Sequence, residues 1–179
     1  MRIILLPLLL ISMTLFSQQH TTDEILKEAR GLASKENKKV FVIFHASWCG
    51  WCHKMDTAMN DPVCKKYFDD NYVIRHLTVY ESKDKKDLET PGALELLTKY
   101  KGNDLGIPYW LIFDADGNLV ADSKIRPANA ATDTEGNNAG CPATENEVKF
   151  FIDVLKQTSS IDNKGLKTIY DRFRQNEIH

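Results

Sequence analysis

Residues 40–52 read Val-Phe-Val-Ile-Phe-His-Ala-Ser-Trp-Cys-Gly-Trp-Cys, an apolar run that leads directly into a pair of cysteines. Residues 40–44 are all β-branched or aromatic, which is typical of a strand buried on both faces. Residues 49–59 are predicted to form a helix. Cys49 and Cys52 therefore lie where a buried strand passes into a helix.

The position of the two cysteines has a chemical consequence. Unpaired N–H groups and the helix dipole at a helix N-terminus favour negative charge, so Cys49 is expected to ionise readily. In Cys-x-x-Cys motifs the thiol pKa of about 8.5 can fall to roughly 3.5–7.5. Cys52, one turn inward, can attack a mixed disulfide formed at Cys49, and the pair can also close into its own disulfide. The two cysteines are predicted to be a redox pair.

The whole chain of 179 residues has ordinary globular composition, with 42% hydrophobic and 27% charged residues. This composition excludes collagen-like, coiled-coil and wholly disordered proteins. The formal net charge of −2 shows no basic excess, so no nucleic-acid partner is expected. Four cysteines are too few for a disulfide-scaffolded miniprotein, so each of them requires its own explanation.

The N-terminus has the layout of a secretory signal peptide, which we expect to span residues 1–17. Arg2 is followed by a nearly continuous apolar run over residues 3–16, and Ser17 offers a small residue at the expected cleavage site. The run is shorter than the roughly 20 apolar residues that a bilayer-spanning helix needs. We therefore expect a periplasmic or secreted protein with no membrane span after cleavage, in a compartment where disulfides persist.

After residue 17 the hydrophobic pattern predicts helices that alternate with strands. Capping boxes at Thr21 with Glu24 and at Thr144 with Glu147 predict two helix starts. Further helices are predicted from Asp61, over residues 93–101 and around residues 166–173, and further strands over residues 72–80, 109–113 and 119–121. This order predicts an α/β sheet with helices on both faces.

Two features of the sequence carry a resemblance to a known family. Residues 40–52 resemble the strand and active-site segment of the thioredoxin superfamily, and Trp48 matches the aromatic residue before that family's first cysteine. Ile107-Pro108 resembles the loop in which the family keeps a cis-proline facing the dithiol. The resemblance covers roughly residues 22–158.

The resemblance implies a thioredoxin-like α/β fold, with a central mixed β-sheet flanked by helices and an extra C-terminal helix. Residues 18–158 are assigned to the thioredoxin-like domain and residues 159–179 to a C-terminal helical extension. We expect the last helix to dock on the core or on a partner.

The resemblance also implies roles for individual residues. Cys49 would be the nucleophile and Cys52 the resolving thiol of a protein-disulfide oxidoreductase that needs no cofactor beyond this dithiol. The residues implied to contact substrate are Trp48, Gly50, Trp51, Ile107 and Pro108. The implied partners are proteins that carry disulfides or thiols, together with an electron-transfer partner. Reduction or isomerisation is favoured over oxidation.

Two positions depart from the family pattern. Trp51 stands where thioredoxins proper carry a proline between the cysteines, which leaves the redox potential open. Ile43 stands where the family places a buried aspartate as proton acceptor for the second cysteine. Another base, such as His45 or water, would have to serve. His45 could instead be a buried, hydrogen-bonded side chain.

Other classes of protein fit parts of the same pattern. Cys49, Cys52 and His53 also match the Cys-x-x-Cys-His pattern for attachment of c-type haem. The same three side chains could contribute to a zinc or copper site, although a structural zinc site requires four ligands and this motif supplies three. A third alternative is a redox-inactive binding module on the thioredoxin fold. His53 could equally tune the reactivity of Cys49 or be merely solvated.

Cys64 and Cys141 have two interpretations. They could form a second disulfide that pins residues 125–143, interpreted as a long surface loop, near the active-site helices. Alternatively, Cys64 is a small buried apolar residue and Cys141 a loop thiol. The charge run over residues 81–89 is interpreted as a solvated loop.

Overall fold

The computed structural model describes residues 19–127, 130 and 134–177. Residues 1–17, where the signal peptide is predicted, lie outside this part of the chain. Within it, no helix combines the length and the apolar character that a membrane crossing requires.

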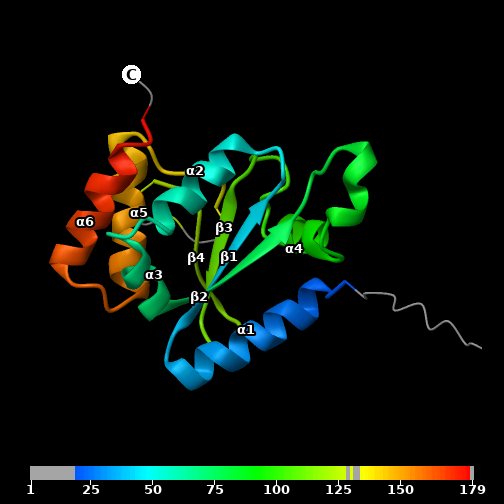
Figure 1. Cartoon of the computed structure of the whole chain (residues 1–179), viewed down its shortest axis with the longest axis horizontal. Coiled ribbons are helices and arrows are strands. Elements are labelled where there is room, and N and C mark those ends of the chain that lie inside the picture. Colours follow the sequence, from blue (N-terminus) through cyan, green and yellow to red (C-terminus); the bar gives the residue numbers. More distant parts are fainter. Residues whose placement is uncertain (1–18, 128–129, 131–133, 178–179) are drawn as a thin grey trace, which may run out of the picture.

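The centre of the molecule is a mixed four-stranded sheet with the order β2-β1-β3-β4 (Figure 1). The strands are β1 (Lys39–His45), β2 (Tyr72–Thr78), β3 (Tyr109–Phe113) and β4 (Leu119–Asp122). β1 runs parallel to β2 and antiparallel to β3, and β3 is antiparallel to β4. The mixed sheet expected from the family resemblance is therefore present.

Helices cover both faces of this sheet. They are α1 (Thr22–Glu36), α2 (Gly50–Met59), α3 (Lys65–Asn71), α4 (Ala93–Lys99), α5 (Glu145–Thr158) and α6 (Asn163–Arg174). The short elements are the 3-10 helix η1 (Lys83–Leu88) and the paired strands β5 (Lys124–Ile125) and β6 (Asn137–Asn138).

Strand β1 is buried on both faces, as its continuous apolar run predicts. Phe41 and Ile43 face a core shared with α2, α3, α5 and α6. Val40, Val42 and Phe44 face a second core, which α1 and α4 close. The sheet therefore separates two hydrophobic layers, and α2 lies on the first of them.

Both predicted capping boxes are present. The Thr21 hydroxyl accepts the Glu24 N–H and the Glu24 carboxylate accepts the Thr21 N–H at the start of α1. Thr144 and Glu147 repeat this exchange at the start of α5. The signature is local in sequence, which is why it could be recognised without the fold.

The predicted helix start at Asp61 is wrong, because α3 begins at Lys65. The Asp61 carboxylate accepts the N–H of Val63, two residues ahead, at 3.1 Å and so closes a turn. It also pairs with Arg172 of α6 at 2.7 Å. The ion pair holds Asp61 in the turn, and the helix starts after it.

The C-terminal helix docks on the core. Phe173 of α6 is fully buried, and its ring centroid lies 5.0 Å from that of Phe151 in α5 and 6.3 Å from that of Phe68 in α3. Helices α5 and α6 lie side by side in Figure 1. The residues assigned to a helical extension thus share one hydrophobic core with the domain that they follow.

Candidate active site

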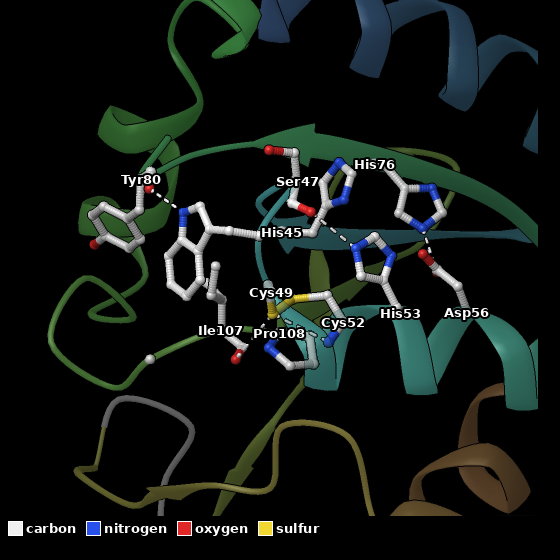
Figure 2. The surroundings of a disulfide bond; sticks show 12 residues. His45, Ser47, Cys49, Cys52, His53, Asp56, His76, Tyr80, Ile107 and Pro108 are labelled. Carbon is white, nitrogen blue, oxygen red and sulfur yellow. Dashed lines mark hydrogen bonds and ion pairs between the residues drawn. A yellow bond between two sulfur atoms is a disulfide. The ribbon is translucent and has the colours of Figure 1, made fainter. Parts of the chain in front are cut away.

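The two cysteines of the motif lie at the first turn of α2. Cys49 is the N-cap and is joined to Cys52 by a disulfide with a Cα–Cα distance of 5.2 Å (Figure 2). The backbone N–H of Cys52 points at Sγ of Cys49, 3.1 Å away. This N–H would stabilise a Cys49 thiolate in the reduced protein. The predicted pair is therefore in place, with Cys49 at the outer end.

The disulfide is more covered than expected, because Cys49 is only 3% and Cys52 only 1% exposed. Ala46 and Ile107 pack against the two cysteines. The indoles of Trp48 and Trp51 beside the disulfide are 60% and 43% exposed. A substrate would therefore meet two aromatic side chains around a nearly buried sulfur.

The loop opposite the disulfide carries the expected cis peptide bond, between Ile107 and Pro108. The carbonyl oxygen of Ile107 lies 3.6 Å from Sγ of Cys49. Figure 2 shows Ile107 and Pro108 next to the two cysteines. The predicted proline loop and the motif thus meet, although they are far apart in sequence.

Glu81 holds the turn that precedes Cys49, a role that the sequence did not predict. Its carboxylate accepts the Ser47 N–H at 2.5 Å and the Ser47 hydroxyl at 2.8 Å. These bonds lower the pKa of Glu81, the backbone bond most strongly. The indole N–H of Trp48 donates to the carbonyl of Tyr80 at 2.8 Å. Glu81 is only 4% exposed, so the start of the 81–89 charge run is not solvated.

The histidines near α2 are hydrogen-bonded. His53 is exposed, and its Nε2 lies 3.0 Å from the Ser47 carbonyl oxygen, so its ring is hydrogen-bonded as well as solvated. His45 Nε2 lies 3.2 Å from the Thr78 hydroxyl, and its ring centroid is 5.0 Å from that of His76. Burial lowers the pKa of His45, and the neighbouring His76 lowers it further.

Ile43 is 1% exposed and belongs to the hydrophobic core, so this position supplies no proton acceptor for Cys52. On the adjacent strand β2, the residue opposite Ile43 is His76, which pairs with Asp56 of α2 at 2.7 Å. Asp56 lies one turn beyond Cys52 on α2. The titratable groups that act on the nearby His45 are His76, Asp56, Glu81 and His53.

A family model described as thioredoxin-like matches residues 22–115, which is more than half of the chain. The chain belongs to the thioredoxin-like family. No curated protein sequence matches it.

Several solved structures resemble this thioredoxin-like chain at low identity. A disulphide isomerase from Xylella fastidiosa Temecula1 is 16% identical, with a TM-score of 0.49 over 92% of this chain and 98% of that one. The C-terminal domain of Neisseria meningitidis DsbD in the oxidised form is 20% identical, with a TM-score of 0.44 over 79% and 99%. A putative protein disulfide isomerase from Bacteroides thetaiotaomicron is 20% identical, with a TM-score of 0.41 over 73% and 79%.

The family assignment and the Cys49–Cys52 disulfide together support a thiol–disulfide oxidoreductase. The alternatives based on Cys49, Cys52 and His53 fit the geometry less well. The sulfurs of Cys49 and Cys52 are bonded to each other, and the His53 ring is hydrogen-bonded to the Ser47 carbonyl. Among the described residues, no cluster of three or more His, Cys, Asp or Glu side chains could hold a metal ion.

The second disulfide considered for Cys64 and Cys141 is not formed, because both cysteines are free. Cys64 is fully buried in the core, as the second interpretation has it. Cys141, interpreted as a loop thiol, is also buried, and Asn176 donates to its sulfur at 3.5 Å. Burial raises the pKa of Cys64 to about 11 and that of Cys141 to about 12. Both are packing residues in this thioredoxin-like fold.

Proposed function

We propose that the protein is an exported thiol–disulfide oxidoreductase that reduces or isomerises disulfides of other proteins through Cys49 and Cys52. The observation that carries this proposal is the Cys49–Cys52 disulfide at the first turn of α2, with Cys49 Sγ facing the Ile107 carbonyl. The substrate would contact the residues next to the two cysteines in the motif and the proline loop, which are Trp48, Gly50, Trp51, Ile107 and Pro108.

In reduction, the Cys49 thiolate attacks one sulfur of a substrate disulfide, and the other substrate sulfur leaves as a thiolate that takes up a proton. Cys52 then loses its proton and attacks Sγ of Cys49, which expels the second substrate thiol. The substrate gains two electrons and the enzyme closes its disulfide. An electron-transfer partner with a dithiol would restore Cys49 and Cys52. In isomerisation, a substrate thiol resolves the mixed disulfide instead.

The surroundings of Cys49 favour reduction or isomerisation over oxidation. A strongly oxidising pair has a heavily stabilised reduced form. Within the described residues, Sγ of Cys49 accepts one hydrogen bond, from the Cys52 N–H, and the nearby His53 ring is directed elsewhere. We therefore expect a reduction potential well below about −120 mV, between the roughly −180 mV typical of an isomerase and the roughly −270 mV typical of a reductase. Equilibration with glutathione or dithiothreitol buffers measures it.

Two cysteine variants test the proposal. Cys49→Ser is expected to abolish the reduction of insulin disulfides, whereas Cys52→Ser is expected to accumulate mixed disulfides with substrate proteins. Cys64→Ser serves as the matched control, because that thiol is buried in the core and free. Full activity of the Cys49 variant would refute the proposal, and so would the absence of any mixed disulfide with the Cys52 variant.

Export is proposed from the N-terminal sequence. The apolar run before Ser17 has the length and flanks of a cleavable signal. Production of the full chain in a bacterium with a periplasm should yield a periplasmic protein that lacks about the first 17 residues. Recovery of an uncleaved protein from the cytoplasm would contradict export without affecting the proposed chemistry.

A further inference from the structure

A hollow of about 340 Å³ lies between α1, α4 and the sheet, away from the disulfide. It reaches Val40 near the start of β1 and Phe113 at the end of β3, which are partners in the sheet. Val40 lies five residues before the end of β1, or about 16 Å along the strand, and the cysteines follow beyond that end. In Figure 1, α1 is at the bottom of the view and α2 at the top. We call this site the α1–α4 hollow.

The inside of the α1–α4 hollow is apolar. Val40 and Phe113 are buried and belong to the hydrophobic layer that α1 and α4 close. The half-buried side chains of Leu26, Leu96 and Tyr100 pack against the same layer and also line the hollow. We call these five side chains the floor. A ligand that entered the hollow would therefore contact the edge of the core.

The charged side chains around the floor are mostly cationic. Among the described residues that line the hollow, four carry a charge: Lys27 and Arg30 of α1, Lys99 of α4, and the acidic Asp23. Within the part of the chain that the structure describes, none of the three cations forms an ion pair. Lys99 Nζ lies 5.5 Å from the centroid of the Tyr100 ring, which belongs to the floor. The hollow thus combines an apolar floor with an excess of two positive charges.

Arg30 is held beside the hollow by the turn between β3 and β4. A Cβ at Gly117 in this turn would lie 2.6 Å from Arg30 Nη1, so the guanidinium lies against the glycine backbone. Gly117 has a φ of +92°, which glycine adopts without strain. Arg30 is partly buried, so solvent screens its charge less than that of an exposed lysine. It is therefore the cation best placed to bind an anion.

We propose that the α1–α4 hollow binds a small amphipathic anion, a carboxylate with an apolar chain or ring. The apolar part lies on the floor and the carboxylate pairs with Arg30. An arginine guanidinium matches a carboxylate through two parallel hydrogen bonds. This site is separate from the proposed oxidoreductase chemistry and does not depend on it.

The size of the hollow favours a small molecule over a protein partner. Its volume is at the lower end of the roughly 300–1,000 Å³ of small-molecule sites. A stable protein interface needs about 800 Å² on each side. Among the described residues, the exposed large hydrophobic side chains all lie outside the hollow; they are Trp48, Trp51, Val63, Leu88, Leu94 and Val120. The apolar surface is therefore inside the hollow and not around it.

Titration of the oxidised protein with sodium octanoate, followed by methyl NMR, tests the site. We expect saturable shifts for the methyl groups of Leu26, Leu96 and Val40, and none for Ile107, which packs against the cysteines. Hexanoate should bind about tenfold more weakly than octanoate, because it lacks two CH₂ groups worth about 0.8 kcal/mol each on burial.

The role of the charge is tested separately. Arg30→Gln is expected to weaken octanoate binding about tenfold, as the loss of a charge-assisted hydrogen bond implies. Binding of the neutral 1-octanol to the same variant should stay unchanged, which also shows that the hollow is still formed. Lys35→Gln is the matched control, because Lys35 is exposed in the last turn of the same helix and does not line the hollow.

Three results would overturn the inference. They are the absence of saturable shifts at Leu26 and Leu96, shifts at Ile107 in their place, and equal octanoate affinities for Arg30→Gln and the wild type. Saturating octanoate should leave the reduction of hydroxyethyl disulfide unchanged, because the cysteines lie beyond the other end of β1. Failure of this site and failure of the proposed function are thus read from different measurements.

Discussion

Replacing Phe173 by alanine tests whether α6 is part of the core or an appended helix. The side chain is fully buried between two aromatic rings, those of Phe151 and Phe68. Truncation of a buried Phe to Ala costs about 3–5 kcal/mol, from lost transfer energy and the remaining cavity. We expect a loss in this range, which is a large part of the roughly 5–15 kcal/mol that stabilises a typical domain.

Urea unfolding measures this loss. With a denaturant slope of about 2 kcal/mol/M, the midpoint of Phe173→Ala should fall by roughly 1.5–2.5 M with an unchanged slope. Val63→Ala is the control, because Val63 is 56% exposed and its truncation should change stability by less than about 0.5 kcal/mol. A loss below about 1 kcal/mol for Phe173→Ala would refute the assignment of α6 to the core.

Three further results are expected. Because the pKa of His45 is lowered, this side chain stays neutral in the folded protein but is protonated near pH 6.5 in the unfolded chain, so stability falls as the pH drops from about 7 to 5. The urea midpoint should fall less over this pH range for His45→Gln than for the wild type. Parallel plots of midpoint against pH for the two proteins would contradict this. The raised thiol pKa values of Cys64 and Cys141 predict that iodoacetamide at neutral pH labels only Cys49 rapidly in the reduced folded protein, as peptide mass spectrometry would show. Glu81→Ala removes the hydrogen-bond acceptor that holds the turn before α2, so kcat/KM for insulin reduction should fall about tenfold or more. Glu81→Gln should recover part of this loss. An unaltered kcat/KM in Glu81→Ala would exclude a role of Glu81 in positioning Cys49.

The parts of the fold that the sequence predicted are those with local signals. The apolar composition of residues 40–44 is enough to predict a buried strand, and the capping box of Thr21 and Glu24 spans only four residues. The mixed sheet and the cis bond before Pro108 followed from the family resemblance. The disulfide between Cys49 and Cys52 followed from their spacing at a helix start.

The features that the sequence did not predict depend on contacts between distant residues. Asp61 is held in a turn by Arg172, which lies 111 positions further along the chain. Glu81 is buried because it binds Ser47, 34 positions earlier, and nothing within the charge run itself distinguishes it from its neighbours.

Residues 139–143 were interpreted as part of a surface loop for a related reason. They belong to residues 125–143, whose content of Ala, Asn, Thr and Gly is typical of exposed loops. The anchoring bond from Asn138 to the Pro108 carbonyl forms only once the sheet has brought both segments together. The contact with the proline loop could not be inferred from either segment alone.

The sulfur of Cys49 also caps α2, since it accepts the N–H of Cys52. An anionic sulfur caps a helix better than a neutral disulfide sulfur does, because the helix dipole favours negative charge at this end. Electron transfer and the order of the first turn of α2 are therefore thermodynamically linked. Any substitution that frays this turn without touching a cysteine should favour the oxidised state, so the midpoint potential of the protein reports on the integrity of a helix end.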